Sequence, residues 1–227
     1  MIFRKKIYLA FQGIGPFRTA IGERLSRFVV THSRLVIVRD EESFSRVKSW
    51  CKNTKVIQSF DPVYSSINRA ITHETTTEQW INTFNVNVRG MYFMSKYTIP
   101  HMLKQGYGVI VNNSSILGLK ASPGFAAYNS SKGAVNQLTR SMALEYADKG
   151  IRVNAICLGT VYTPLADHMF EQWGDKEAAR EHYISVHPIG RLAEPEEIAH
   201  AVLFLCDDNI KFMTGTMLSV DGGLSAK

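Results

Sequence analysis

Apolar runs of strand length alternate with segments of helical periodicity in the first sixty residues, and this alternation constrains the fold more than any other feature. Three runs rich in Ile, Leu and Val are separated by two segments whose apolar residues recur every three to four positions. The five segments, strand and helix in turn, are 7–11, 20–30, 34–39, 42–52 and 55–60. Alternating strands and helices favour parallel strand pairing. The pattern therefore predicts an α/β fold with a doubly wound parallel sheet.

Length and composition indicate one domain without a metal centre. The chain has 227 residues, of which 45% are hydrophobic, and this is enough to bury one substantial core over 1–227. The three cysteines, Cys51, Cys157 and Cys206, have no metal-like spacing, and the seven histidines are equally dispersed. We interpret the cysteines as free thiols of a reducing compartment, which favours a cytoplasmic location.

The sequence predicts neither a membrane partner nor a nucleic-acid partner. No run approaches the roughly 20 apolar residues of a membrane span. Four basic residues and no acid occur in the first 22 positions, which we interpret as a basic strand rather than a targeting peptide. The net charge is +6, but the basic residues form no long cluster with interleaved aromatics. Small anionic ligands explain this charge equally well.

Three polar side chains between positions 115 and 132 predict redox chemistry. Tyr128 and Lys132 are four residues apart in a segment of helical pattern, so both side chains project from one face. An ammonium beside a phenol lowers the tyrosine pKa from about 10 toward neutrality, where it can exchange a proton with a carbonyl oxygen. Ser115 follows an apolar run that predicts a buried strand, and open α/β sheets bind ligands at the carboxyl ends of strands. This spacing indicates chemistry at a carbonyl or an alcohol.

A Tyr and a Lys at this spacing are common on helix surfaces, so the pair alone is weak evidence. Six ordered sequence blocks around it make the interpretation specific. The blocks are FNVNVRG at 84–90, GVIVNNSSILG at 108–118, YNSSK at 128–132, RVNAICLGTVYTP at 152–164, PIGRLAEPEEIA at 188–199 and TGTMLSVDGG at 214–223. Through them, residues 78–223 resemble the short-chain dehydrogenase/reductase family, in the branch of 3-oxoacyl-carrier-protein reductases and sugar dehydrogenases. The resemblance implies a single Rossmann-like domain, with a divergent dinucleotide-binding part at 1–72 and a catalytic and substrate part at 73–227.

The resemblance also implies the positions of the remaining elements. Helices are expected at 78–104, 128–148 and 195–206, and strands at 108–114, 151–158 and 216–220. The less regular segment 164–187 is expected to form a lid beside the nicotinamide. Its large apolar residues, Met169, Phe170 and Trp173, either line a pocket or pack on the core, and we favour the core.

Four catalytic residues follow from the resemblance. Tyr128 would be the general acid/base, and Ser115 would orient the substrate oxygen. Lys132 would lower the pKa of Tyr128 and hold the nicotinamide ribose beside it. Asn87 would hold a water that links Lys132 to solvent. The chemistry implied is hydride transfer at a nicotinamide.

After the strand at 151–158, the resemblance implies a loop that closes over the nicotinamide. Gly159, Val161 and Thr163 stand at the family's cofactor-contacting positions, and the resemblance implies that Val161 and Thr163 contact the carboxamide and the pyrophosphate. Leu158 stands where the family usually has proline, which fixes one backbone angle, so a looser turn is expected.

The amino-terminal third departs from the family pattern at the phosphate-binding glycines. The family has T-G-x-x-x-G-x-G there, whereas this chain has AFQGIGPFRTAIGERL at 10–25. Gly13, Ile14 and Gly15 are the candidate dinucleotide contacts, but every alignment lacks the first Thr-Gly pair. Arg18 is a candidate compensating charge on a phosphate.

A second departure follows the third strand. Asp61 ends that strand, and Asn68 lies in the nearest counterpart of the family's Asn-Asn-Ala-Gly that walls the adenine ribose. About two dozen residues are missing between them relative to the usual crossover. Six intervening residues reach roughly 20 to 22 Å, which barely spans the crossover. We therefore expect the fourth strand and its preceding helix to be shortened or missing.

The end of the second strand bears on cofactor choice. Val38 stands at the position where an acid would favour NAD, and Arg39 follows it, which favours the 2′-phosphate of NADP. The prediction is NADP(H) in preference to NAD(H), although Asp40 keeps NAD open.

The sequence therefore predicts an NAD(P)(H)-dependent oxidoreductase that interconverts a small-molecule carbonyl and a secondary alcohol. The alternative is a non-catalytic family member, acting as a binding or oligomer-forming module with weakened dinucleotide binding. A third interpretation is an altered sequence or gene model in the amino-terminal third. Homodimers or homotetramers are implied by the resemblance, through the helices at 78–104 and 128–148 and the last strand.

Overall fold

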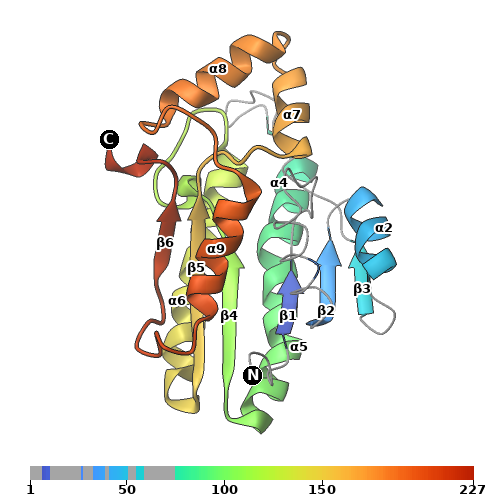
Figure 1. The fold of residues 1–227 in the computed structure, drawn as a ribbon, viewed down its shortest axis with the longest axis vertical. Coiled ribbons are helices and arrows are strands. Elements are labelled where there is room, and N and C mark those ends of the chain that lie inside the picture. Colours follow the sequence, from blue (N-terminus) through green and yellow to red (C-terminus); the bar gives the residue numbers. More distant parts are fainter. Residues whose placement is uncertain (1–6, 11–26, 28–32, 39–40, 51–54, 59–74) are drawn as a thin grey trace. The chain divides into compact units, whose positions relative to one another are not determined.

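The computed structural model divides the chain into two compact units, residues 1–61 and residues 62–227. The described residues are 7–10, 27, 33–38, 41–50, 55–58 and 75–227. Apart from Arg27, which is helical, the predicted helix at 20–30 lies outside them, as does the shortened fourth strand predicted near Asn68. Figure 1 shows the elements in chain order.

The amino-terminal unit contains a parallel sheet of three strands. These are β1 (Ile7–Ala10), β2 (Ser33–Val38) and β3 (Lys55–Gln58), with β2 in the centre. Both pairings are parallel. Helix α2 (Glu41–Trp50) connects β2 to β3, as a parallel crossover requires. These elements confirm the three strands and the second helix predicted from the alternating pattern.

The carboxyl-terminal unit has a second parallel sheet, ordered β4-β5-β6. Its strands are β4 (Gly108–Asn113), β5 (Ile151–Leu158) and β6 (Met217–Val220). The central strand β5 is buried from Ile151 through Cys157, which explains its nearly continuous apolar character. Because β4 and β5 pair in parallel from Gly108 to Asn113, their carboxyl ends lie at the same edge.

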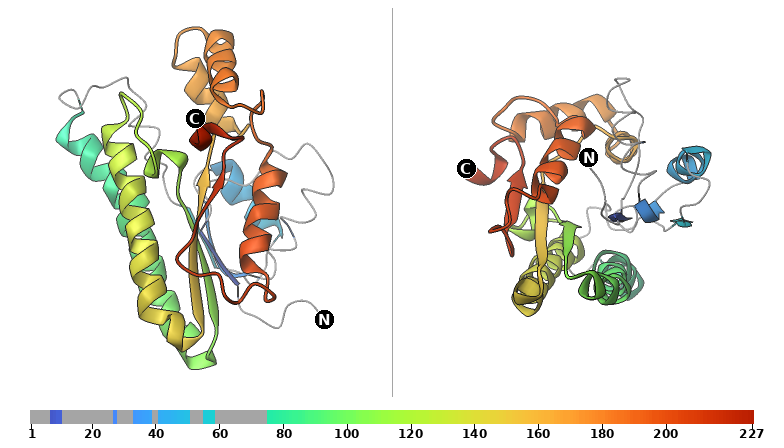
Figure 2. Two further views of the ribbon diagram at one scale, coloured as in Figure 1. Left: turned by 90° about the vertical axis from the view of Figure 1, so that its left-hand side faces the viewer. Right: turned by 60° about the horizontal axis from the view of Figure 1, so that its bottom comes forward.

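Helices cover both faces of this second sheet. Helices α5 (Gly90–Gln105) and α6 (Ala126–Tyr146) lie on one face, and α9 (Pro195–Cys206) lies on the other (Figure 2). Parallel strands with crossover helices on both faces confirm the predicted α/β class. None of the helices in the described part of the chain is long and apolar enough to cross a membrane.

The helix predicted over 78–104 is interrupted by a π-helical turn. Helix α4 (Thr77–Phe84) begins at a capping box, in which Thr76 and Gln79 each bind the other's main-chain N–H. The π-helical segment η1 (Asn85–Arg89) follows it and leads directly into α5. Such turns insert one extra residue and often occur at functional sites. Here the turn contains the candidate catalytic residue Asn87.

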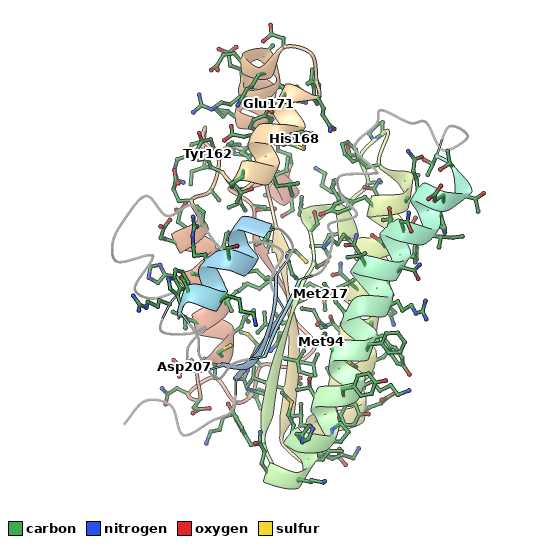
Figure 3. The ribbon with its side chains drawn as sticks, turned by 90° about the vertical axis from the view of Figure 1, so that its right-hand side faces the viewer. Met94, Tyr162, His168, Glu171, Asp207 and Met217 are labelled. Carbon is green, nitrogen blue, oxygen red and sulfur yellow. The ribbon has the colours of Figure 1, made fainter. Side chains whose placement is uncertain are left out.

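The predicted lid segment forms two helices with a small core of their own. Helix α7 (Pro164–Glu171) is capped by the Thr163 side chain, and helix α8 (Lys176–Val186) is capped by Asp175. The buried residues of this core are Ala166, Phe170, Ala179 and Leu192. Phe170 is fully buried and Met169 packs against this core, so the core interpretation of these two side chains is confirmed. For Trp173, which is exposed, that interpretation is wrong. Figure 3 shows Tyr162 close to α7, which carries His168 and Glu171.

Candidate active site

The four predicted catalytic residues come from three elements that meet at the carboxyl end of β4. Asn87 lies in η1, Tyr128 and Lys132 lie in the first two turns of α6, and Ser115 follows β4. Ser115 begins the short 3-10 helix η2 (Ile116–Gly118), where its Oγ accepts a hydrogen bond from the Leu117 N–H at 3.1 Å. This local bond fixes the side chain at the edge where parallel sheets bind ligands.

Lys132 is a fully buried cation beside Tyr128. Its Nζ lies 5.5 Å from the centroid of the Tyr128 ring and donates a hydrogen bond to the Asn113 carbonyl at 3.0 Å. Burial of a charged group is costly unless the group is hydrogen-bonded, and the end of β4 supplies such a partner. The structure therefore places the Lys132 ammonium beside the Tyr128 ring.

Asn87 is connected to the same helix through a serine. Its Nδ2 donates to Ser131 Oγ at 2.9 Å, and Ser131 Oγ donates to the Tyr128 carbonyl at 2.8 Å. Asn87 is fully buried, and its Oδ1 accepts no hydrogen bond within the described residues. Buried polar atoms of this kind normally bind an ordered water. The geometry therefore fits the water-holding role that the resemblance implies.

A second buried network, absent from the sequence predictions, fixes the loop after β4 against α6. Ser114 Oγ donates to Asn136 Oδ1 at 2.6 Å, and Asn136 Nδ2 donates to the Gly118 carbonyl at 2.9 Å. A Cβ at Gly118 would lie 2.8 Å from the main chain of Lys132, so only glycine permits this approach. The sequence signal that could have identified Asn136 is its spacing, because it lies one helical turn beyond Lys132.

Main-chain hydrogen bonds to Ala193 hold the loop after β5. Val161 forms a single parallel bridge with Ala193, in which Ala193 N–H donates to the Thr160 carbonyl at 3.1 Å and Tyr162 N–H donates to the Ala193 carbonyl at 2.8 Å. Because strand neighbours alternate in direction, the N–H and C=O of Val161 itself face away from Ala193. Thr163 Oγ1 caps α7 by accepting from the Ala166 N–H at 3.3 Å.

The turn that begins this loop is tightly packed. Gly159 N–H donates to the Val220 carbonyl at 3.0 Å, and Thr160 N–H donates to His187 Nε2 at 3.1 Å. A Cβ at Gly159 would lie 2.7 Å from His187 Nε2 and 2.9 Å from the Asp221 Cα, so a side chain is excluded there. The turn after Leu158 is therefore held by the hydrogen bonds of Gly159 and Thr160, although Leu158 lacks the ring of a proline.

The pKa shift of Asp221 and the state of the cysteines have simple physical causes. Burial alone would raise the pKa of Asp221, but hydrogen bonds from the Ser225 side chain and from the Ser225 and Gly223 N–H groups outweigh it, so the pKa is lowered. Burial raises the pKa of the Cys157 thiol, whereas Cys206 is exposed. Both are free cysteines, as predicted, and Cys51 lies outside the described residues. In the described part, no three metal-ligating side chains cluster.

The remaining predicted cofactor contacts lie outside the described residues. They are Gly13, Ile14, Gly15, Arg39, Asp61 and Asn68, together with the candidate compensating charge Arg18. The four candidate catalytic residues all lie within the described residues. The contacts expected for the phosphates and the adenine ribose remain predictions.

Known proteins resemble the chain over most of its length. The model of a family described as enoyl-(acyl carrier protein) reductase matches residues 23–225. The 3-oxoacyl-[acyl-carrier-protein] reductase of Thermotoga maritima is 36% identical over 176 residues, which are 75% of this chain and 69% of that protein. An inactive 2-(S)-hydroxypropyl-CoM dehydrogenase of Xanthobacter autotrophicus is 43% identical over 155 residues, 68% of this chain and 67% of that protein.

Solved structures match the whole chain. Levodione reductase aligns with a TM-score of 0.79 at 23% identity, covering 97% of this chain and 98% of its own, which shows a shared fold. ElxO, solved with NADP bound, aligns with a TM-score of 0.75 at 26% identity, covering 99% of this chain and 100% of its own. Together with the Asn87, Ser115, Tyr128 and Lys132 arrangement, these matches show that the chain belongs to the short-chain dehydrogenase/reductase family.

Proposed function

We propose that the protein is an NAD(P)(H)-dependent oxidoreductase that interconverts a carbonyl and a secondary alcohol, with Tyr128 as general acid/base. The observation that carries this proposal is the fully buried Lys132 ammonium, 5.5 Å from the Tyr128 ring centroid and anchored on the Asn113 carbonyl. A buried charge requires a compensating arrangement, and this one stabilises a phenolate.

In the direction of reduction, the chain's own residues handle the substrate oxygen and the proton. Ser115 Oγ donates a hydrogen bond to the carbonyl oxygen and orients it toward Tyr128. The Tyr128 hydroxyl gives its proton to that oxygen as the carbonyl carbon gains a hydride, so the product is the neutral alcohol. A bound nicotinamide dinucleotide supplies the hydride. Lys132 stabilises the phenolate that remains.

The proton lost from Tyr128 is replaced through buried polar groups. Asn87 Oδ1 is buried and accepts no hydrogen bond within the described residues, so a water bound there completes its hydrogen bonding. We propose that this water leads protons from solvent to Lys132, and from Lys132 to the phenolate. Oxidation of the alcohol uses the same groups in the opposite direction.

Several main-chain and side-chain groups suit a nicotinamide cofactor. The N–H and C=O of Val161 face away from its bridge partner Ala193, as a complementary carboxamide would require. Lys132 Nζ is a hydrogen-bond donor suited to ribose hydroxyls. We propose NADP(H) in preference to NAD(H) because Arg39 follows the second strand, and the similar protein ElxO was solved with NADP.

Assembly and domain organisation are part of the same proposal. We propose one Rossmann-like domain over 1–227, divided into 1–72 and 73–227, that pairs as a homodimer or homotetramer. Large apolar side chains are exposed along α4, α5 and α6, where pairing is expected. They are Trp80, Ile81, Tyr92, Tyr97, Leu103 and Leu144. Burial of such a surface in a second copy would stabilise the assembly. A cytoplasmic location stays a prediction.

A non-catalytic role is the second candidate function. One observation favours it, namely the 43% identity to a relative described as inactive. The altered glycine motif at 10–25 would weaken dinucleotide binding, since each lost main-chain donor costs about 1 kcal/mol. In this role the fold would serve as a binding or oligomer-forming module.

One experiment separates the two functions. NADPH and NADH are titrated into the protein by fluorescence, and a panel of small ketones and secondary alcohols is then tested for change in nicotinamide absorbance. Binding with turnover, and tighter binding of NADPH, is expected. Absence of binding of either dinucleotide at millimolar concentration would overturn the oxidoreductase proposal. Binding without turnover on any substrate would favour the non-catalytic role.

A further inference from the structure

His187 joins two separate main-chain segments beside the loop after β5. It follows the last residue of α8 and has 3% of its surface exposed. Its Nε2 accepts a hydrogen bond from the Thr160 N–H at 3.1 Å, and its Nδ1 lies 2.6 Å from the Tyr183 carbonyl. One ring therefore contacts the lid helix at one nitrogen and the loop after β5 at the other.

These two partners define the protonation of the ring. A main-chain N–H can only donate, so Nε2 must be the unprotonated nitrogen. A carbonyl can only accept, so Nδ1 must carry the proton. The two hydrogen bonds therefore require the Nδ1–H tautomer. A phenyl ring of similar size would fill the space but would make neither bond.

Close packing leaves the His187 ring little freedom. A Cβ at Gly159 would lie 2.7 Å from Nε2 and 3.1 Å from Cδ2, so the ring lies directly against the Gly159 main chain. The same hypothetical Cβ would lie 2.9 Å from the Asp221 Cα, which borders the turn from the end of β6. The Asp221 carboxylate is itself held by the Gly223 and Ser225 N–H groups, at 3.1 and 2.9 Å.

The His187 contact controls the direction of the loop that follows. Thr160 uses its N–H on His187 and its carbonyl on the Ala193 N–H, so both of its main-chain groups are fixed. Val161 comes next, with its N–H and C=O facing away from Ala193, and its C=O accepts a hydrogen bond from Thr163 Oγ1 at 3.4 Å. The orientation of both groups depends on the peptide planes on either side. At Leu158 no proline ring restrains the turn.

We propose that His187 is a positioning residue that fixes the Thr160 peptide and thereby orients Val161 toward the nicotinamide carboxamide. This inference rests on the proposed function, since it assigns Val161 to the cofactor. It also links the lid helix α8 to the cofactor loop through the Tyr183 carbonyl. His187 touches neither substrate nor cofactor in this role.

The first test uses the protein without dinucleotide. Nitrogen-15 NMR of the histidine ring should show His187 as the Nδ1–H tautomer, and the Thr160 amide should be protected from hydrogen exchange. His187→Phe should remove the Thr160 protection, and His187→Gln should retain most of it because its side-chain oxygen can accept from the same N–H. An Nε2–H tautomer, or unchanged Thr160 exchange in His187→Phe, would overturn the inference.

The second test measures dinucleotide affinity and turnover in the same variants. His187→Phe should weaken NADPH binding and lower kcat by about 10-fold each, the loss expected for one hydrogen bond, with the KM for the carbonyl substrate nearly unchanged. His187→Gln should recover both to within about 3-fold. His200→Phe, an exposed histidine of α9, serves as the matched control. Equal behaviour of the Phe and Gln variants would overturn the positioning role.

The outcomes for the inference and for the proposed function are distinguishable. If the wild-type protein binds no dinucleotide, the proposed function fails and so does the assignment of Val161, whatever the NMR result. If the wild type binds and turns over, but His187→Phe matches it in both, only the inference fails. Should His187→Phe not fold, the wild-type tautomer and the Gln variant still decide it.

Discussion

The two units of the chain differ in how they relate to the family pattern. In the carboxyl-terminal unit, hydrogen bonds to buried groups hold three of the four candidate catalytic residues, from Asn87 through Ser131 to the Tyr128 carbonyl and from Lys132 to the Asn113 carbonyl. In the amino-terminal unit, the strands β1, β2 and β3 keep the expected parallel pairing, but the glycine motif between β1 and β2 is altered.

The predicted catalytic groups and the predicted phosphate contacts therefore lie in different units. All four candidate catalytic residues lie within 62–227, whereas the altered glycine motif and the candidate NADP contact Arg39 lie within 1–61. The contacts predicted for the nicotinamide end of the cofactor, Lys132 and Val161 among them, lie in the carboxyl-terminal unit. A change in one stretch therefore need not remove the chemistry of the other. Substitutions in each unit should accordingly separate turnover from binding.

Tyr128→Phe should give the largest effect. Loss of the hydroxyl removes the general acid/base, which contributes about 10² to 10⁴-fold to catalysis, so kcat should fall by about 10³-fold. The ring remains beside Lys132, and the dinucleotide dissociation constant should stay within about 2-fold. Steady-state kinetics and fluorescence titration measure the two quantities.

Tyr146→Phe is the matched control, because it removes a hydroxyl at the carboxyl end of the same helix. It should leave kcat unchanged. If Tyr128→Phe weakened dinucleotide binding as much as it slowed turnover, proton handling and binding would not be separable, and the comparison between the units would break down.

Arg152→Met should give the next largest effect, on stability rather than activity. The buried Arg152 guanidinium donates to the carbonyls of Leu205, Met213 and Asp207 at 3.0 to 3.2 Å. The carbonyls of Leu205 and Asp207 lie at the carboxyl end of α9, where helix carbonyls have no intrahelical partner. Leaving them unsatisfied should lower the free energy of unfolding by about 3 kcal/mol in urea denaturation.

The same variant tests whether the chain is one domain. In a single cooperative domain, Arg152→Met should lower hydrogen-exchange protection in β1, β2 and β3 as well as in β4, β5 and β6. Loss confined to the carboxyl-terminal strands would mean that the two units unfold separately. Arg140→Met, at an exposed arginine of α6, should change neither measurement.

Local sequence patterns predicted the strands and the second helix of the first sixty residues, and the helix from Tyr128, because their signals are local. Most other elements after residue 75 were predicted from the family resemblance. The apolar runs at 34–39 and 55–60 appear as β2 and β3, and the helix expected from Tyr128 appears as α6. The family blocks led to the Tyr128 and Lys132 pairing, which depends on a spacing of four residues on one helix.

Contacts between distant positions escaped the sequence-based predictions. The bonds from Asn87 to Ser131, from Ser114 to Asn136, and from Thr160 to His187 join residues 44, 22 and 27 positions apart. No periodicity or motif encodes such partners, since they form only when separate elements pack. The π-helical turn at Asn85–Arg89 is similar, because an extra residue in a helix leaves the apolar pattern almost unchanged.

Arg39→Ser should change cofactor preference through the amino-terminal unit alone. If Arg39 binds the 2′-phosphate of NADP, its loss should weaken NADPH binding by about 10-fold and leave NADH binding unchanged. Lys48→Ser, at an exposed basic residue in the last turn of α2, is the matched control. An equal loss for both dinucleotides, or no loss, would show that the preference for NADP was wrongly predicted.

Glu197→Gln should give the smallest effect, and one that depends on pH. The Arg191 guanidinium donates to both Glu197 carboxylate oxygens at 2.7 and 2.8 Å, and the Glu194 N–H donates to one of them. These bonds lower the pKa of Glu197 from 4.5 to about 2. Because the folded-state pKa lies below the unfolded one, the pair stabilises the fold above about pH 4.5 and loses this contribution as the pH falls toward 2.

The side chains of this pair are about half exposed, so solvent reduces its contribution to about 1 kcal/mol. Urea denaturation at pH 7 should show that loss in Glu197→Gln, and the wild type and the variant should converge as the pH falls toward 2. Glu181→Gln, at an exposed acid of α8, should follow the wild type throughout. A constant difference between the Glu197 variant and the wild type down to pH 2 would contradict the ion-pair explanation. If the units unfold separately, the effect should be confined to hydrogen exchange in the carboxyl-terminal unit, because Glu197 and Arg191 both lie there.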